Sequence, residues 1–256
     1  LDEARELAAL IRQTGVPFTA CLPIPRYDPL FVETARRLHA GEAGDLLQAS
    51  FTYLAAKGPL YLAREPHYRD ADVRVPALSG GEAGMFSGYG IAALEWFTGR
   101  RIRRVFARAD SRFYPAYREQ AMEDLVSAVL KFEGGAVGAL TAGRMPSPSA
   151  PTLIEFDLTG TRGNLAYSSD RPAGAAHVYG PYLGGDGRER PAGGPAMVSI
   201  AAPAASLGAD FVDAVLEGRE PLLPARDAFS TIEVLAAMYR SAQSGAEVEV
   251  ERVWPE

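Results

Sequence analysis

Apolar residues recur along the chain with two periods, and these periods predict its elements. A spacing of three or four residues indicates a helix and strict alternation indicates a strand. The first helix begins at once behind Asp2 and stops at Gly15, and others are expected over 29–40 and over the apolar stretch that ends at Gly99. Two closing helices are expected to bury Leu207, Phe211, Ala214 and Val215 in the first and Ala228, Ile232, Leu235 and Tyr239 in the second.

Alternating stretches predict a series of strands. They are expected over 16–22, 45–55 and 101–109, in hairpins over 124–144 and 152–168, and in the closing EVEVERV. Residues 23–29 and 57–80 are expected to be loops, and the second is long, polar and aromatic, as functional loops often are. Residues 170–196 hold much of the Gly and Pro and are expected to form a surface excursion. Successive hairpins with helices before, between and after them predict an α+β fold with a predominantly antiparallel sheet.

Composition narrows the class of protein without naming a function. The 256 residues are 47% hydrophobic and 23% charged, an ordinary globular balance. A net charge of −6 with no Lys/Arg-rich run argues against a nucleic-acid partner, and no apolar run reaches the ~18–20 residues of a membrane span. Cys21 is the single cysteine, so no internal disulfide forms, and a cytoplasmic location is expected. Because a helical pattern starts at Leu1, we expect a longer protein to continue upstream.

Side chains able to do chemistry are few. His39, His67 and His177 lack metal-ligand spacing, and the lone cysteine cannot complete a site, so no metal is expected. His67 and Tyr68 lie in the loop segment REPHYRD, which could bind a polyol or a phosphate or simply be solvated. Lys57 opens the same loop and could face a pocket, although a solvated lysine is the commoner case.

The stretch GMFSGYGIAALEWFTG, residues 84–99, places Tyr89 between Gly88 and Gly90. GYGIAA matches the dinucleotide fingerprint G-x-G-x-x-A, but that fingerprint follows a buried strand, and SGGEAGMFS has no strand pattern. A second interpretation is that the glycines allow tight packing and that Tyr89 is a packing aromatic.

Six stretches occur in an order that suggests a third interpretation. They are EARELAALIRQTGVPF, PRYDP, LHAGEAGDL, EDLVSAVLKFEGGAVGAL, GTRGNL and the closing DFVDAVLEGREPLLPARDAFSTIEVLAAMYRSAQSG. In this order they resemble the C-terminal part of the glucose–fructose oxidoreductase / inositol dehydrogenase / rhizopine-catabolism family (Gfo/Idh/MocA). PRYDP, for example, resembles that family's Arg-Arg-Phe-Asp-Pro segment, with Pro25 in place of its first arginine.

The resemblance implies a domain organisation and a function. Residues 1–21 would be the last helix and strand of a Rossmann domain, and residues 22–256 a substrate and oligomerisation domain with an open sheet and helices on one face. The intact protein would use NAD or NADP on a sugar or polyol hydroxyl, whereas this chain alone is expected to bind no cofactor, because the family's glycine-rich loop and Glu-Lys-Pro motif are absent from it. A homodimer or homotetramer through the open sheet face is expected, since DLVSAVLKF is apolar on both faces.

The resemblance also assigns roles to particular residues. The family carries an acid/base His or Tyr ten residues before the glycine that ends this helix, and counting back from Gly99 gives Tyr89. The family's aspartate four residues earlier is replaced by Met85, or by Ser87 if a small deletion is allowed. A free phenol has a pKa near ~10, so it needs a positive neighbour to act as a base at neutral pH. Tyr89 is therefore the expected catalytic residue, and the expected substrate-binding residues are Arg26, Tyr27, Lys57, His67, Tyr68 and Ser87. The alternative is a non-catalytic sheet domain for oligomer assembly or ligand sensing.

Overall fold

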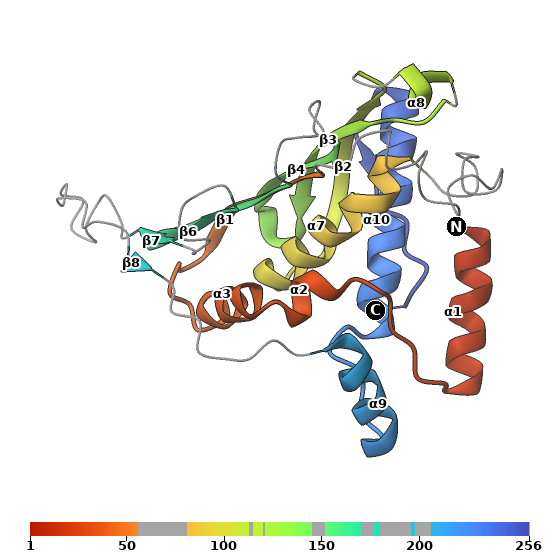
Figure 1. Ribbon diagram of the computed structural model, residues 1–256, viewed down its shortest axis with the longest axis vertical. Coiled ribbons are helices and arrows are strands. Elements are labelled where there is room, and N and C mark those ends of the chain that lie inside the picture. The colour runs from red at the N-terminus through yellow and green to blue at the C-terminus, as the bar shows by residue number, and fades with distance from the viewer. Residues whose placement is uncertain are drawn as a thin grey trace.

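One open sheet with helices against it forms the body of the molecule (Figure 1). The computed structural model describes residues 1–55, 81–112, 115–119, 121–144, 152–169, 177–179, 196–197 and 206–255. Its helices are α1 (Asp2–Thr14), α2 (Pro23–Tyr27), α3 (Pro29–His39), α7 (Glu82–Thr98), α8 (Pro115–Glu119), α9 (Leu207–Glu217) and α10 (Ala225–Ser244). Its strands are β1 (Leu46–Ala55), β2 (Ile102–Asp110), β3 (Leu125–Phe132), β4 (Val137–Arg144), β5 (Leu153–Gly160), β6 (Gly163–Ser168), β7 (His177–Tyr179), β8 (Ala196–Met197) and β9 (Val248–Glu249).

The strands join in the order β8-β7-β6-β5-β1-β4-β3-β2-β9. The pairs are antiparallel except β1 with β4, which run parallel at the centre of the sheet. Both predicted hairpins form, β3–β4 around a short 3₁₀ turn and β5–β6 around a tight turn. The α+β class and the mostly antiparallel sheet are therefore confirmed.

One face of the sheet carries the core. Helix α7 packs on β1 and β4, α10 packs on β2, and Figure 1 shows α3, α7 and α10 on the same side. Alternate residues of β3 are buried, among them Leu130, and the residues between them, such as Val129, are exposed on the other face. The ring of Phe31 from α3 packs against Phe97 of α7 and Phe156 of β5 at centroid distances of 5.6 and 5.4 Å.

Helix α7 is apolar almost all round, as expected of a helix enclosed by other elements. It ends at Gly99, whose φ of 62° suits the left-handed C-cap position. Gly88 and Gly90 lie inside this helix, and no strand runs into it among the residues described. A Cβ at Gly90 would lie 2.3 Å from Leu140 Cδ1 and 2.7 Å from Phe51 Cδ1. The GYGIAA stretch is thus part of a helix packed against the sheet, and its interpretation as a dinucleotide fingerprint is wrong.

Three local expectations are corrected. Residues 16–22 form no strand, because no described strand runs beside them to accept their hydrogen bonds. The expected loop 23–29 contains the short helix α2, and the closing strand is limited to the two residues of β9.

On helix α1, Ala8 and Ile11 pack against Phe229 of α10.

The buried faces of the two closing helices also differ from the expected ones, since Val215 and Ile232 are exposed. Helix α9 buries Asp210 and Ala214, and α10 buries several polar residues with its apolar ones. Ser241 shows how such a polar group is paired, because its Oγ accepts from Ala107 N at 2.8 Å and donates to the Ala246 carbonyl at 2.6 Å. Hydrophobic periodicity cannot anticipate a buried face whose polar atoms are paired.

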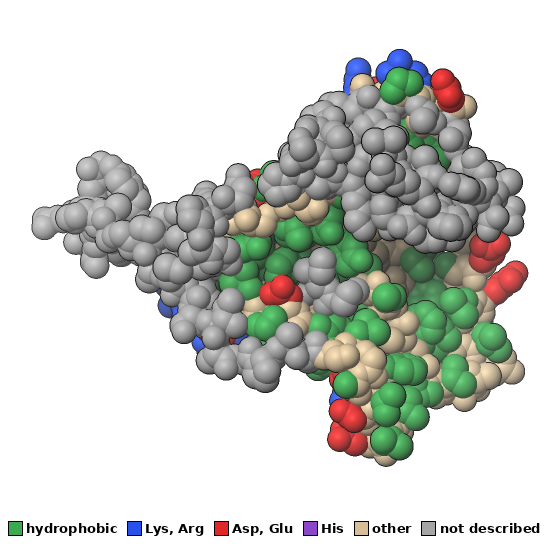
Figure 2. All heavy atoms as spheres, viewed as in Figure 1, with side chains coloured by type: hydrophobic (Ala, Val, Ile, Leu, Met, Phe, Trp, Pro, Cys, Tyr) green, Lys and Arg blue, Asp and Glu red, His purple; other side chains and the backbone are tan. Residues whose placement is uncertain are grey.

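Apolar side chains also lie on the outside of the molecule. Figure 2 shows them over α1 and α9, where Leu10 and Leu216 are among the exposed ones. No helix within the described ranges is both long and apolar enough to cross a membrane. In the same ranges, no three His, Cys, Asp or Glu side chains gather as metal ligands would.

Candidate functional site

Tyr89 lies in an aromatic group at the centre of the sheet. Tyr53 of β1 stacks on Phe86 of α7 at 4.9 Å between ring centroids, and on Tyr89 at 5.5 Å with an interplanar angle of 17°. Tyr89 remains partly exposed, and its hydroxyl has no hydrogen-bond partner among the described residues. The three rings therefore form one stack, the aromatic wall, with the half-buried Tyr89 at one end.

Burial decides the protonation of the Tyr89 phenol. Burial raises the pKa of Tyr89, and the nearby Cys21 thiol adds to the effect. Burial and Tyr89 raise the pKa of Tyr53, while Arg144 opposes the shift. The Arg144 side chain is 1% exposed, and its guanidinium lies 5.1 Å from the Phe86 ring centroid. Tyr89 is therefore a neutral phenol at neutral pH.

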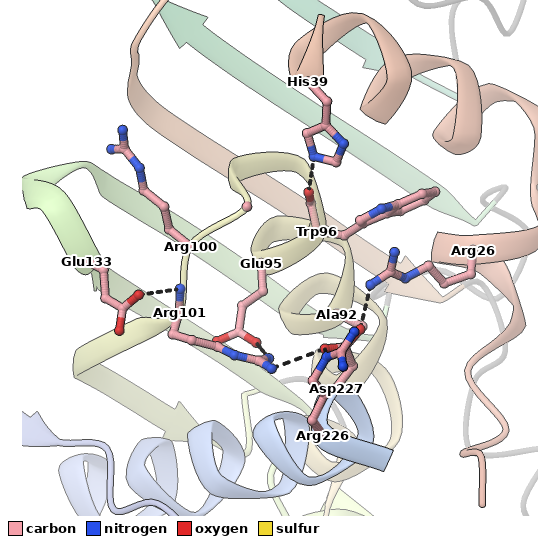
Figure 3. Close-up of a pocket in the computed structure, with 11 residues that line it drawn as sticks. Arg26, His39, Ala92, Glu95, Trp96, Arg100, Arg101, Glu133, Arg226 and Asp227 are labelled. Carbon is pink, nitrogen blue, oxygen red and sulfur yellow. Dashed lines mark hydrogen bonds and ion pairs between the residues drawn. The ribbon is translucent and has the colours of Figure 1, made fainter. Parts of the chain in front are cut away.

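A pocket of about 310 Å³ opens at the C-terminal half of α7 (Figure 3). Ala92 and Trp96 line it, and they lie three and seven residues beyond Tyr89, on the same side of the helix. Arg26 reaches the pocket from α2, with its guanidinium 4.3 Å above the Trp96 ring and Nη2 2.5 Å from an Asp227 oxygen. Burial outweighs Asp227 and lowers the pKa of Arg26, which nevertheless stays charged.

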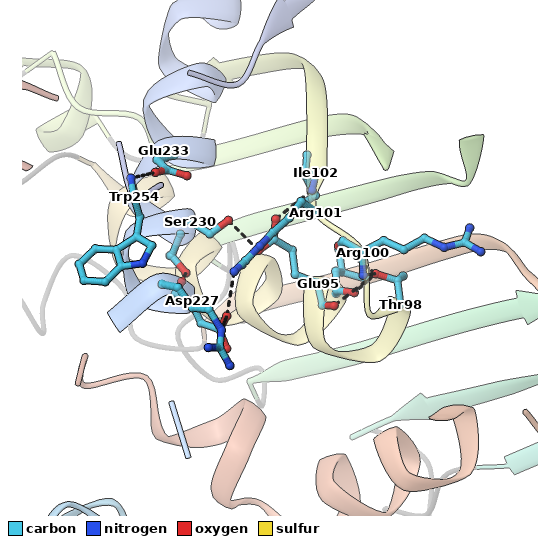
Figure 4. Close-up of polar contacts among 12 residues, drawn as sticks. Glu95, Thr98, Arg100, Arg101, Ile102, Asp227, Ser230, Glu233 and Trp254 are labelled. Atoms are coloured by element: carbon cyan, nitrogen blue, oxygen red, sulfur yellow. Dashed lines mark hydrogen bonds and ion pairs between the residues drawn. The ribbon is translucent and has the colours of Figure 1, made fainter. Parts of the chain in front are cut away.

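The floor of this pocket is an alternating array of cations and carboxylates. Arg101 contacts Asp227 at 3.2 Å and Glu95 at 2.8 Å. Glu95 also accepts from Ile102 N at 2.9 Å and from Ser230 Oγ at 2.7 Å (Figure 4). Such a surface offers donors and acceptors side by side, which suits a ligand with several hydroxyl groups.

The fold agrees with the family suggested by the sequence. A family model described as the GFO/IDH/MocA C-terminal domain matches residues 31–166, more than half of the chain. The chain belongs to the Gfo/Idh/MocA family. No curated protein matches it in sequence.

Solved structures share the fold of this Gfo/Idh/MocA domain at low sequence identity. A putative oxidoreductase from Thermotoga maritima is 16% identical, with a TM-score of 0.77 over 98% of this chain and 69% of that one. Levoglucosan dehydrogenase, in a complex with NADH and L-sorbose, is 18% identical, with a TM-score of 0.76 over 98% and 71%. Scyllo-inositol dehydrogenase from Lactobacillus casei, with NAD(H) and scyllo-inositol bound, is 18% identical, with a TM-score of 0.69 over 97% and 69%.

The structure brings some of the predicted residues of this Gfo/Idh/MocA domain together and separates others. Arg26 lies beside Trp96, on the side of α7 that also carries Tyr89. Tyr27 is buried, and its hydroxyl donates to Asp210 Oδ2 at 2.9 Å; burial and Asp210 raise its pKa. Ser87 is 0% exposed, and its hydroxyl has no hydrogen-bond partner in the described part of the chain. These placements give Tyr27 and Ser87 interior roles. Lys57, His67 and Tyr68 lie outside the described residues.

Sequence reasoning missed four residues of the site. Tyr53 and Arg144 come from the neighbouring strands β1 and β4, where Ala55 pairs with Arg144. Trp96 and Asp227 meet through Arg26, although they come from different helices. Trp96 follows Tyr89 by two turns, so the helical period could have found it. The other three meet only through strand pairing and helix packing, which the pattern does not specify.

Proposed function

We propose that this chain is the substrate domain of an NAD(P)-dependent oxidoreductase that acts on a sugar or polyol hydroxyl, with its nucleotide-binding domain outside these residues. The observation that carries the proposal is the family match over residues 31–166. Two of the structural neighbours are a sugar dehydrogenase and an inositol dehydrogenase with bound nicotinamide cofactors, and this chain spans about 70% of each, at 71% and 69%. A polyol suits both the aromatic wall and the paired charges of the pocket further along the same side of α7.

The GYGIAA stretch does not fit the phosphates of a dinucleotide. The two glycines of GYGIAA lie in mid-helix, with Leu140 and Phe51 where a Cβ of Gly90 would be, so they leave no cradle for a pyrophosphate. The proposal therefore places cofactor binding in another domain, and it assigns to this chain the binding of the polyol and the transfer of its hydroxyl proton.

Tyr89 is the proposed acid/base residue. The residue is half-buried and its hydroxyl has no partner among the described residues, so the hydroxyl is free to donate a hydrogen bond to a substrate oxygen. Because its pKa is raised, it is ready as an acid at neutral pH and needs an added cation to act as a base. Lys57 or a lysine of the nucleotide-binding domain would supply that cation. Arg26 and Trp96 would bind the far end of the polyol.

The test is Tyr89→Phe in the protein that joins this chain to its nucleotide-binding domain. Loss of the hydroxyl should lower kcat/KM for the polyol by roughly 10²–10⁴, the usual range for a lost acid/base. The melting temperature should barely move, because the hydroxyl makes no hydrogen bond with the described residues. Tyr167→Phe is the matched control, since Tyr167 packs among Phe31 and Phe156 and should tolerate the change. Unchanged turnover in Tyr89→Phe would end the assignment.

A second candidate function is a non-catalytic sheet domain for assembly or ligand sensing. It is favoured by Met85, which stands where the family pattern has a carboxylate, and by the exposed Val129 and Val137 on the open sheet face. The same protein separates the two candidates. A sensing domain would bind a polyol in calorimetry with no turnover under any cofactor, whereas an enzyme would show both.

A further inference from the structure

Helix α7 begins without a capping side chain of its own. Its N-cap residue is Gly81, with φ −94° and ψ −151°, and no side chain of the described residues provides the usual cap. The first turn of any helix leaves backbone N–H groups without an intrahelical acceptor, and Ser, Thr, Asp or Asn at the N-cap ordinarily supplies one. The helix that carries Tyr89 therefore depends on another element for this acceptor.

Tyr239 of α10 supplies the acceptor. The Gly81 N–H donates to Tyr239 Oη at 3.0 Å. Tyr239 in turn donates its proton to Glu123 Oε1 at 2.8 Å. The hydroxyl thus joins the start of α7 to a carboxylate that lies two residues before β3.

Glu123 fills the space that a capping side chain would need. It is 9% exposed, and a Cβ on Gly81 would clash with its carboxylate. The φ of Gly81 is open to any residue, so the glycine is required by the nearness of this carboxylate and not by its backbone. A carboxylate at this end of α7 also complements the positive end of the helix dipole.

We propose that Tyr239 and Glu123 are positioning residues, which cap α7 from outside and so hold its first two turns, and Tyr89 with them, in place for proton transfer. This inference rests on the proposed function. Proton transfer needs the acid within about 2.6–3.2 Å of the substrate oxygen, and a 1 Å misplacement can cost about 10²-fold in rate. A frayed first turn of α7 would produce such a displacement without touching the pocket near Trp96.

The test uses the intact enzyme with its nucleotide-binding domain. Tyr239→Phe removes one oxygen and should lower kcat by about 10- to 100-fold, while the KM for the cofactor is unchanged. Amide hydrogen exchange over residues 84–89 should become faster in this variant. Tyr167→Phe, which removes a phenol elsewhere in the core, should change neither kcat nor this exchange.

A rescue separates positioning from a general loss of stability. Gly81→Ser alone should be harmful, because its Cβ meets Glu123. In Glu123→Ala/Tyr239→Phe the space is open, and adding Gly81→Ser gives α7 an N-cap hydroxyl of its own. The triple variant should regain kcat and slow exchange over 84–89, although both original capping groups are gone.

The possible results of these experiments separate this inference from the proposed function. A large loss in Tyr89→Phe with unchanged kcat or unchanged exchange in Tyr239→Phe would overturn this inference and leave the proposed function standing. A triple variant that regains its melting temperature but not kcat would also overturn it. Unchanged kcat in Tyr89→Phe would overturn the proposed function and this inference together.

Discussion

Gly88 and Gly90 flank Tyr89, and replacing each by alanine tests whether they serve packing. In the interior of a helix, Gly→Ala is favourable by about 0.5–1 kcal/mol, because glycine loses more backbone entropy on folding. At Gly88 the new Cβ would lie 3.3 Å from Leu22 Cδ2 and from Thr231 Cγ2. These are tight contacts with the ends of side chains, and a shift of a few tenths of an ångström relieves them. Gly88→Ala should therefore be neutral or slightly stabilising.

At Gly90 the same methyl group has no room. The Cβ would lie 2.3 Å from Leu140 Cδ1 and 2.7 Å from Phe51 Cδ1, and both residues are 1% exposed on the adjacent strands β4 and β1. Overpacking a closed core costs about 1–3 kcal/mol, which exceeds the gain in helix propensity. We therefore expect Gly90→Ala to be less stable than Gly88→Ala by about 1–3 kcal/mol.

Urea denaturation of both variants in the same background measures this difference. The midpoint should fall for Gly90→Ala and hold for Gly88→Ala, with equal m-values in the two variants. If Gly90→Ala proves as stable as Gly88→Ala, then α7 does not rest closely on the sheet at this position. The glycines would then be better explained as space for a ligand beside Tyr89.

Three further expectations follow from burial and exposure. Ser87→Ala should raise the free energy of unfolding by about 1 kcal/mol, because the Ser87 hydroxyl is buried without a partner among the described residues. The same variant should have a lower kcat/KM only if Ser87 binds substrate. Titration of this chain with NADH should show no saturable fluorescence change at micromolar concentrations, and saturation would contradict the proposed placement of the cofactor site. Val129 is 57% exposed on the open face of β3, and Val129→Glu should convert a dimer or tetramer to monomer in light scattering. Val212 is 55% exposed on α9, and Val212→Glu should leave the oligomer intact. A monomeric parent at micromolar concentration would refute assembly through this face.

The sequence predicted the elements well where one side faces the core. The alternating residues of 124–144 and the apolar run ending at Gly99 indicated β3, β4 and α7 with nearly correct limits, because burial on a sheet imposes these periods. The prediction failed where pairing decides the outcome. Residues 16–22 have strand composition but no described strand beside them, and Ile232 was expected inside although polar neighbours with hydrogen-bond partners take the buried side of α10.

Of the candidate site, the sequence could predict only residues whose positions follow from spacing along the chain. Tyr89 was proposed from the family resemblance, which places an acid/base residue ten positions before the glycine that ends the helix, and the structure confirms that α7 ends at Gly99. Tyr53, Arg144 and Asp227 reach the site from three other elements, and nothing local in their sequence marks them. Arg26 was predicted to bind substrate, which stays a prediction, and its carboxylate partner Asp227 could be revealed only by tertiary contacts.

The attachments of α7 connect the fold to the proposed chemistry. At the start of the helix, Tyr239 accepts a hydrogen bond from Gly81, and in the middle Gly90 allows the helix to pack closely on the sheet. Near the end of the helix, Glu95 accepts hydrogen bonds from Ile102 of β2 and Ser230 of α10. Tyr89 lies between the first and third of these attachments and next to the second. A group that transfers a proton must be held to within a fraction of an ångström, and fixing a helix at both ends and along its length achieves this without occupying the hydroxyl itself. The proposed role of Tyr89 in the reaction rests on the family resemblance, and these three attachments give α7 the support that this role requires.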